Sequence, residues 1–89
     1  MTKLSLQFYE TKLGIGYQFS KYDTIFCHEY SAGAMENPGL VTFTDFYLYE
    51  SPSSNQHMLR FADTITHEAA HHWFGDYVTM KWWDDLWLN

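Results

Sequence analysis

The stretch HEAAHH, residues 67 to 72, contains three of the five histidines of this chain. His67 and His71 are four positions apart, and on a helix two such side chains lie on one face, about 40° apart and one turn displaced. The pattern H-E-x-x-H on a helix therefore predicts two imidazoles that converge on a zinc ion. Glu68 lies on the same flank, where its carboxylate can act as the general base of a hydrolysis.

The residues around this stretch predict the helix that the motif requires. Ser53 and Gln56 fit a capping box, and Gly75 fits the position just past a helix end, so we expect a helix from about 54 to 74. On a helical wheel, an apolar stripe and a polar stripe separate. The apolar stripe comprises Met58, Ala62, Ile65, Ala69 and Trp73, and the polar stripe comprises Arg60, Asp63, Thr64, His67 and His71. The apolar stripe is expected to face a core, and the polar stripe to carry chemistry.

An alternative is a surface helix that carries histidines by chance. A motif this short arises without function in roughly one or two per hundred chains of such composition. The third histidine of the stretch, His72, lies about 140° round the helix from His67. We therefore expect His72 to pack or to support the site rather than to bind the metal.

The upstream sequence predicts a mixed fold. Residues 4 to 13 fit a short helix, and two stretches, TIFCHEY (24 to 30) and GLVTFTDFYLYE (39 to 50), have the β-branched and aromatic content of strands. The glycines and proline of SAGAMENPG (31 to 39) indicate an irregular connection between them. We expect the fold class α+β, with two or three strands followed by the helix of the metal motif.

Length and composition limit the class of protein. The 89 residues allow one small domain. Eleven acidic and five basic residues give a net charge of -6, which argues against nucleic acid as a partner, because phosphate contacts require a surplus of lysine and arginine. Cys27 is the only cysteine, so we expect a small apolar residue of a strand rather than a disulfide. The sequence predicts no particular cellular compartment.

A second motif, GAMEN at residues 33 to 37, precedes the first. By itself it fits a turn between two strands. Together with H-E-x-x-H downstream, in this order and spacing, it makes the chain resemble the M1 family of zinc aminopeptidases. The resemblance extends over GYQFSKYD (16 to 23), AGAMENPGLVTF (32 to 43) and THEAAHHWFGDYVTMKWWDDLWLN (66 to 89).

This resemblance implies a thermolysin-like zinc metallopeptidase domain. In it His67 and His71 bind zinc, Glu68 is the general base, and a zinc-activated water releases N-terminal residues from peptides. Glu36 binds the free α-amine of the substrate, so an internal peptide, which has no such cation, is not cleaved. The implied substrate-binding residues are Gly33, Ala34, Met35, Glu36 and Asn37.

The end of the chain matches the family just before its third zinc ligand. In the family a glutamate directly follows W-L-N, here residues 87 to 89, so the ligand would be residue 90. The catalytic tyrosine and a further amine-binding residue are also expected elsewhere. We therefore expect residues 1 to 89 to be a fragment of the catalytic domain, with the isolated chain inactive and at best a weak zinc binder. Asp76, Asp84 and Asp85 are the acids nearest in sequence, and we expect them to be loop and helix-start residues.

The second hypothesis is a non-catalytic structural or interaction piece derived from an M1 peptidase. The apolar run WWDDLWLN (82 to 89) is expected to leave Trp82, Trp83 and Trp87 partly exposed unless a protein partner or missing domains cover them. Tightly bound zinc in a one-to-one ratio would favour the enzyme over this alternative.

Overall fold

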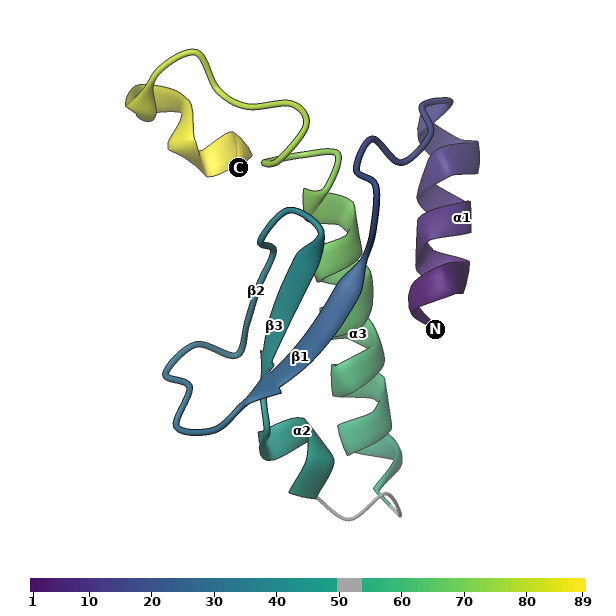
Figure 1. The fold of residues 1–89 in the computed structure, drawn as a ribbon, viewed down its shortest axis with the longest axis vertical. Helices are drawn as coiled ribbons and strands as arrows, with labels where there is room; N and C mark the ends of the chain where they lie inside the picture. The colour runs from purple at the N-terminus through teal and green to yellow at the C-terminus, as the bar shows by residue number, and fades with distance from the viewer. Residues whose placement is uncertain (50–53) are drawn as a thin grey trace.

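The computed structural model describes residues 1–49 and 54–89, and its elements are shown in Figure 1. They are, in order, α1 (Thr2–Leu13), β1 (Asp23–Cys27), β2 (Ala34–Met35), β3 (Leu40–Thr44), α2 (Phe46–Tyr49), α3 (Asn55–His71) and the 3-10 helix η1 (Trp83–Leu88). The prediction of an α+β fold is confirmed. Among the described residues no helix has the length and hydropathy of a membrane span.

The three strands form one small sheet with β3 in the centre. The strand order is β1-β3-β2, in which β1 is parallel to β3 and β2 is antiparallel to it. The chain passes from β1 to β2 and returns through a tight turn, closed by a hydrogen bond of 2.9 Å from the Leu40 N–H to the Asn37 carbonyl. Figure 1 shows that this turn lies near the C-terminal end of α3. The topology thus brings the segment after β2 to the H-E-x-x-H motif.

The core lies between the sheet and α3. Val41 and Phe43 of β3 and Ile65 of α3 are buried, with 0%, 2% and 8% of their surface exposed. Alternate residues of a strand point to one face, so Val41 and Phe43 both face the helix. Around them pack Tyr22, Phe26, Ala34, Tyr47 and Phe61. The sheet and α3 therefore form the two layers that hold the site.

On its other side α3 packs against α1. The Tyr9 hydroxyl donates to the Thr66 carbonyl at 3.2 Å, and its ring lies 5.7 Å from that of Trp73. Trp73 also donates its indole N–H to the Ile15 carbonyl at 2.9 Å. These contacts join the segment that follows α1 to the C-terminal end of α3. The helix α1 starts two residues before the predicted span of 4 to 13, ends with it at Leu13, and is followed by Gly14, which has φ 67.

The predicted apolar stripe of the long helix is buried only in its second half. Ala69 and Trp73 have 0% and 3% of their surface exposed, but Met58 has 47%. The prediction that Met58 faces a core is therefore wrong for the described residues. Within residues 1–49 and 54–89, no other layer covers that side chain near the start of α3.

The observed helix is shorter than the predicted span of about 54 to 74. It begins at Asn55, and the capping side chain is Ser54, which accepts from the His57 N–H. The predicted capping box includes Ser53, which lies outside the described residues. At its other end α3 stops at His71. The next N–H, that of His72, donates to the Ala69 carbonyl, a tighter i to i−3 bond that ends an α-helix.

The two predicted strands are also shorter than expected. The stretch 24 to 30 stops pairing at Cys27, and Glu29 beyond it has φ 51. The stretch 39 to 50 is a strand only as far as Thr44 and then becomes α2. The Asp45 carbonyl accepts from the Leu48 N–H at 2.8 Å, which turns the chain into this short helix. A third strand, β2, lies inside the segment predicted to be irregular.

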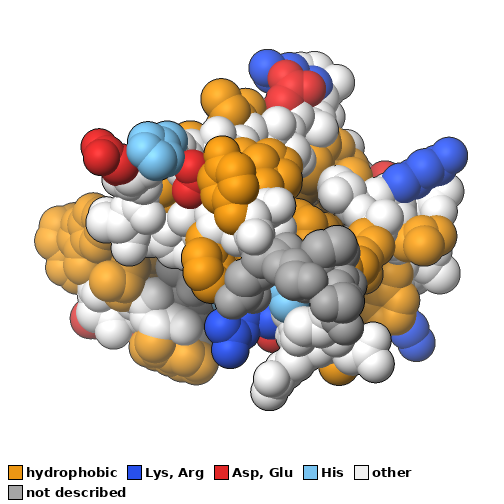
Figure 2. Space-filling view, turned by 90° about the horizontal axis from the view of Figure 1, so that it is seen from below, with side chains coloured by type: hydrophobic (Ala, Val, Ile, Leu, Met, Phe, Trp, Pro, Cys, Tyr) orange, Lys and Arg blue, Asp and Glu red, His pale blue; other side chains and the backbone are white. Residues whose placement is uncertain are grey.

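Several large apolar side chains lie on the surface. Figure 2 shows separate hydrophobic patches on the face seen from below. At the C-terminus, Trp82, Trp83 and Trp87 have 69%, 65% and 79% of their surface exposed. Their exposure agrees with the expectation from the run WWDDLWLN.

Candidate active site

His67 and His71 occupy successive turns at the C-terminal end of α3 and point to one place. Their Nε2 atoms are 3.0 Å apart, and their rings are 4.6 Å apart between centroids and nearly perpendicular. Two imidazole nitrogens bound tetrahedrally to one zinc ion at about 2.0 to 2.1 Å would be separated by about 3.3 Å. The observed separation is close to that value, so the pair fits two ligands of a zinc site.

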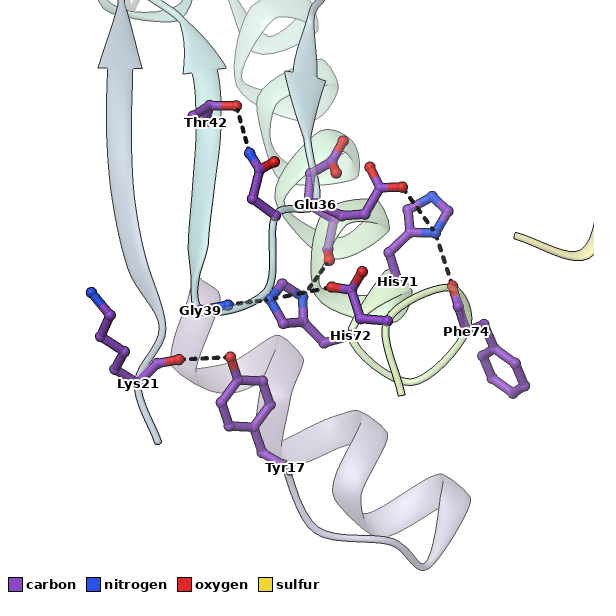
Figure 3. A network of polar contacts seen from close by, with 11 residues as sticks. Tyr17, Lys21, Glu36, Gly39, Thr42, His71, His72 and Phe74 are labelled. Atoms are coloured by element: carbon purple, nitrogen blue, oxygen red, sulfur yellow. Dashed lines mark hydrogen bonds and ion pairs between the residues drawn. The ribbon is translucent and has the colours of Figure 1, made fainter. Parts of the chain in front are cut away.

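The backbone behind His71 fixes which of its nitrogens is free to bind a metal. The His71 Nδ1–H donates to the Phe74 carbonyl at 2.9 Å, which is visible in Figure 3. In the neutral ring Nε2 then carries a bare lone pair. If Nε2 of His67 were also bare, the two lone pairs, 3.0 Å apart, would repel each other. A proton or a cation must therefore lie between the two rings. Zinc would satisfy both.

A glycine lets the chain turn back behind this imidazole. Gly75 has φ +127, and a Cβ at this position would lie 3.3 Å from Nδ1 of His71. A side chain there would be strained and would also press on the ring. Sequence reasoning used Gly75 only as a helix-end signal, and neither it nor the Phe74 carbonyl was expected at the site. No residue pattern marks a backbone carbonyl as a hydrogen-bond partner.

Glu68 lies on the inner flank of the same helix turn. It is 5% exposed, and within the described part of the chain its Oε2 atom has no hydrogen-bond partner. Burial raises the pKa of its carboxyl to about 7, and the negative charge of Glu36 adds to the rise. A carboxyl with such a pKa can accept and return a proton at neutral pH. The structure therefore gives Glu68 an environment typical of a general base.

Glu36 reaches the site from the turn that follows β2. Its Oε1 atom lies 4.0 Å from Nδ1 of His71, and its side chain is 20% exposed. Figure 3 shows its carboxylate directed toward the imidazole of His71. The structure thus brings the two motifs together.

The remaining residues of GAMEN lie along an edge of the sheet. Ala34 and Met35 pair with β3 on one side only, because β2 is the last strand of the sheet. The Gly33 carbonyl accepts from the Thr44 N–H at 2.9 Å. The Asn37 side chain donates to the Thr42 hydroxyl at 3.3 Å. This last contact braces the turn, so the structure gives Asn37 a structural role.

A small cleft lies beside His67 and His71. It has a volume of about 140 Å³ and is lined by His67, Ala70, His71, Phe74 and Asn89. Asn89 is the third residue of the W-L-N sequence, and its side chain lies next to Gly75. Asn89, the last residue of the W-L-N sequence that precedes the third zinc ligand in the family, therefore lies beside His67 and His71.

Two imidazoles alone do not complete a zinc site. Within residues 1–49 and 54–89 there is no group of three or more His, Cys, Asp or Glu side chains that could hold a metal. Asp84 and Asp85, in η1, are therefore not joined to His67 and His71 in such a group. The donors that are present fit zinc in type and direction, and a third protein ligand is needed.

Comparisons with known proteins agree with the two motifs. The model of the peptidase family M1 domain matches residues 1–89. Aminopeptidase N of Streptomyces lividans is 47% identical over 89 residues, which is all of this chain and 10% of that protein. Probable aminopeptidase 2 of Sulfurisphaera tokodaii is 49% identical over 90 residues, again the whole chain and 12% of the relative. For leucyl aminopeptidase of Saccharolobus solfataricus the identity is 46% over 90 residues, with 12% of the relative covered.

The chain therefore spans about a tenth of the length of these relatives. The match to the family model nevertheless extends over every residue of the chain, including both motifs. The chain belongs to peptidase family M1.

Proposed function

We propose that this chain forms part of the active site of a zinc aminopeptidase that removes N-terminal residues from peptides. The observation that carries the proposal is the convergence of the His67 and His71 Nε2 atoms, 3.0 Å apart, beside the buried carboxyl of Glu68. Relatives named as aminopeptidases support the reaction class. The sheet packed on a helix that carries H-E-x-x-H supports a thermolysin-like catalytic domain.

His67 and His71 would hold the zinc ion through their Nε2 atoms. When bound, zinc lowers the pKa of a water molecule to about 7 and polarises a carbonyl group. The Phe74 carbonyl holds the His71 ring in the orientation and tautomer that binding requires. We propose that a third protein ligand completes the site at the cleft that Asn89 lines beside both histidines.

Glu68 would move the protons of the reaction. Its Oε2 atom is buried and accepts no hydrogen bond from the described residues, so it can take a proton from the attacking water. With a pKa of about 7, the carboxylic acid that results can return the proton to the leaving amine. Positioned proton transfer of this kind contributes about 10²- to 10⁴-fold to the rate.

Glu36 would bind the protonated amine of the substrate. The Glu36 side chain is 20% exposed, and its negative charge raises the pKa of the Glu68 carboxyl. The two carboxylates therefore lie near the same space, where their charges repel each other. A substrate ammonium placed there would offset their repulsion and form a charge-assisted hydrogen bond. Only a peptide with a free N-terminus offers that cation, so the enzyme would release one residue at a time.

The free edge of β2 would hold the peptide backbone. Ala34 and Met35 use one side for β3, and an extended peptide can add to the other side of an edge strand. Gly33 lacks a side chain that would block this approach. Asn37 would also contact the substrate. Its hydrogen bond to the Thr42 hydroxyl fixes the turn on which it lies.

The second candidate function is a non-catalytic structural or interaction piece. It is favoured by the exposure of Trp82, Trp83 and Trp87, which further domains or a protein partner would cover. The net charge of -6 argues that this partner is not nucleic acid. Zinc content distinguishes the two functions, since the non-catalytic piece requires none.

The test uses the complete protein that contains this segment. We expect one zinc ion per chain by elemental analysis, together with release of the N-terminal residue from a peptide with a free amine. An N-acetylated copy of the same peptide should be a poor substrate. A zinc-free protein, or one that cleaves both peptides equally, would contradict the proposal.

A further inference from the structure

His72 lies at the centre of the polar network drawn in Figure 3, between α3 and the turn that follows GAMEN. It is 1% exposed. Its ring packs among three aromatic rings, those of Tyr17, Phe19 and Tyr22, at centroid distances of 5.5, 5.6 and 4.8 Å. The imidazole therefore has one fixed position, and its two nitrogens point in set directions.

Each nitrogen of His72 has a backbone partner on a different side of the site. Nδ1 lies 3.0 Å from the Glu68 carbonyl, which can only accept, so Nδ1 carries the proton. Nε2 then accepts from the Gly39 N–H, at the longer distance of 3.4 Å. A neutral imidazole in this tautomer satisfies both groups.

The bond to Glu68 belongs to the helix turn that carries the chemistry. The His72 backbone N–H donates to the Ala69 carbonyl, one residue nearer than the α-helical partner, which would be the Glu68 carbonyl. The His72 side chain takes the place of that missing donor. It thereby closes the turn that contains Glu68 and His71.

The bond to Gly39 belongs to the turn that carries Glu36. Gly39 has φ +76, and a Cβ there would lie 3.3 Å from the Lys21 carbonyl. The Gly39 carbonyl also accepts from the Asp23 N–H at 2.9 Å. Gly39 is therefore fixed against β1. Its N–H points toward α3 and donates to Nε2 of His72.

We propose that His72 is a positioning residue that sets the place of Glu36 relative to Glu68 and His71. This inference rests on the proposed function, in which Glu36 binds the substrate amine. The imidazole of His72 joins the Glu68 backbone to the backbone of the turn that carries Glu36. Loss of the bond to Gly39 would let that turn move away from α3, so that recognition of the amine is weakened more than the catalytic step.

Asp76 is the other polar group near this nitrogen. Its Oδ2 atom lies 3.9 Å from Nε2 of His72, too far for a hydrogen bond. It therefore does not compete with the Gly39 N–H for that nitrogen. The positioning contact is the one to the backbone turn.

The test measures amine recognition directly in the complete, zinc-loaded enzyme. Alanine hydroxamate and propionohydroxamate differ only by the amine, so the ratio of their dissociation constants isolates the contribution of the amine. In wild type we expect alanine hydroxamate to bind at least about tenfold more tightly. In His72→Met, which puts an apolar side chain of similar length in place of the imidazole, this ratio should fall by about tenfold.

Two further variants separate positioning from packing. In His72→Gln the amide oxygen can accept from Gly39, so the ratio should stay within about threefold of wild type. His72→Asn keeps a donor for the Glu68 carbonyl but is too short to reach Gly39, so its ratio should fall as in His72→Met. The Asn variant also keeps the test open if the Met variant does not fold.

The neighbouring Trp73→Phe variant is the matched control. Trp73 is equally buried, but its indole N–H bonds to Ile15, away from GAMEN. We expect a lower melting temperature and an unchanged ratio. A wild-type ratio in all His72 variants, or equal losses in the Gln and Met variants, would overturn the role of His72. A ratio near one in wild type would instead overturn the proposed function, and the inference with it.

Discussion

The Oε1 atom of Glu36 lies 4.0 Å from Nδ1 of His71, although one residue follows a short strand and the other ends a helix much later in the chain. The antiparallel return from β2 into β3 produces this proximity, because it places the turn between them at the C-terminal end of α3. A group that would read the substrate amine and a group that would hold the metal thus lie 4.0 Å apart. Substitutions in the complete protein that contains this segment separate the roles of these groups.

Replacement of His67 by alanine should remove zinc. The site needs three protein ligands, and the described chain supplies two imidazoles. Elemental analysis of purified protein should show almost no zinc in His67→Ala. His28→Ala is the matched control, because His28 is 83% exposed and pairs with Asp45 instead; that variant should keep its zinc. Full zinc content in His67→Ala would show that His67 is not a ligand.

Glu68→Gln should keep zinc but lower kcat by about 10²- to 10⁴-fold, because the amide cannot accept the proton of the attacking water. Glu68 is buried, and glutamine preserves its shape, so folding should be little changed. Steady-state kinetics and zinc analysis on the same sample measure both effects. Glu29→Gln, at an exposed position, serves as the control. Turnover of Glu68→Gln within threefold of wild type would exclude the general-base role.

Glu36→Ala should reduce kcat/KM for peptides with a free amine by about 10- to 150-fold, which corresponds to loss of a charge-assisted contact of about 1.5 to 3 kcal/mol. Peptides with an acetylated N-terminus should be poor substrates of wild type and lose little more. The measurement compares the two peptides in the two proteins. Equal losses on both peptides would mean that Glu36 does not recognise the amine.

Gly75→Ala should weaken both stability and zinc binding. Its φ of +127 strains any other residue, and a Cβ would lie 3.3 Å from Nδ1 of His71. We expect a loss of about 1 to 3 kcal/mol in the free energy of unfolding and about tenfold in zinc affinity. Thermal unfolding and competition with a chelator measure these effects. Gly14→Ala is the control, because Gly14 also has a positive φ but no atom within 4 Å. It should lose stability alone, and equal zinc affinities in the two variants would contradict the role of Gly75.

Alkaline pH should destabilise the fold through two partly buried tyrosines. Burial raises the pKa of Tyr17 to about 12 and raises that of Tyr22 above its usual value. A tyrosine in the unfolded chain ionises near the ordinary tyrosine pKa of 10.0. The stabilisation is therefore complete below that pH and is lost as the pH rises through the folded-state pKa. A titration that follows phenolate absorbance should show tyrosines that ionise at a higher pH than a tyrosine of the unfolded chain. The variant Tyr22→Phe should have one fewer such tyrosine. An unchanged titration in that variant would contradict the assignment.

The sequence predicted those parts of the fold that depend on local periodicity. The wheel of α3 placed Ile65 and Ala69 in the core because a buried helix face repeats with the helical period, and both are buried. The strand content of 24 to 27 and 40 to 44 was likewise visible in β-branched and aromatic residues. The prediction of a third strand was left open, because Ala34 and Met35 have little intrinsic strand preference. Pairing with Phe43 and Thr42 of β3 makes them a strand, and such tertiary pairing is not encoded locally.

For the candidate site, the sequence predicted which side chains lie there but not what holds them. The spacing of His67 and His71 was sufficient to predict their convergence, because helix geometry alone determines it. The partners of the site are the Phe74 carbonyl, the Gly39 N–H and the Glu68 carbonyl. These are backbone atoms, which every residue has, so residue type gives no signal for them. The sequence predicted that His72 packs or supports the site, and His72 is buried. Its backbone partners could be identified only once the turn after β2 was placed against α3.

The early end of α3 has an electrostatic consequence. A helix carries a partial negative charge of about half a unit at its C-terminus. Because α3 stops at His71 rather than near residue 74, this negative end lies at the two imidazoles instead of about one turn beyond them. Both imidazoles are neutral when they bind a metal, so the helix itself supplies attraction for a dication where the side chains supply only lone pairs.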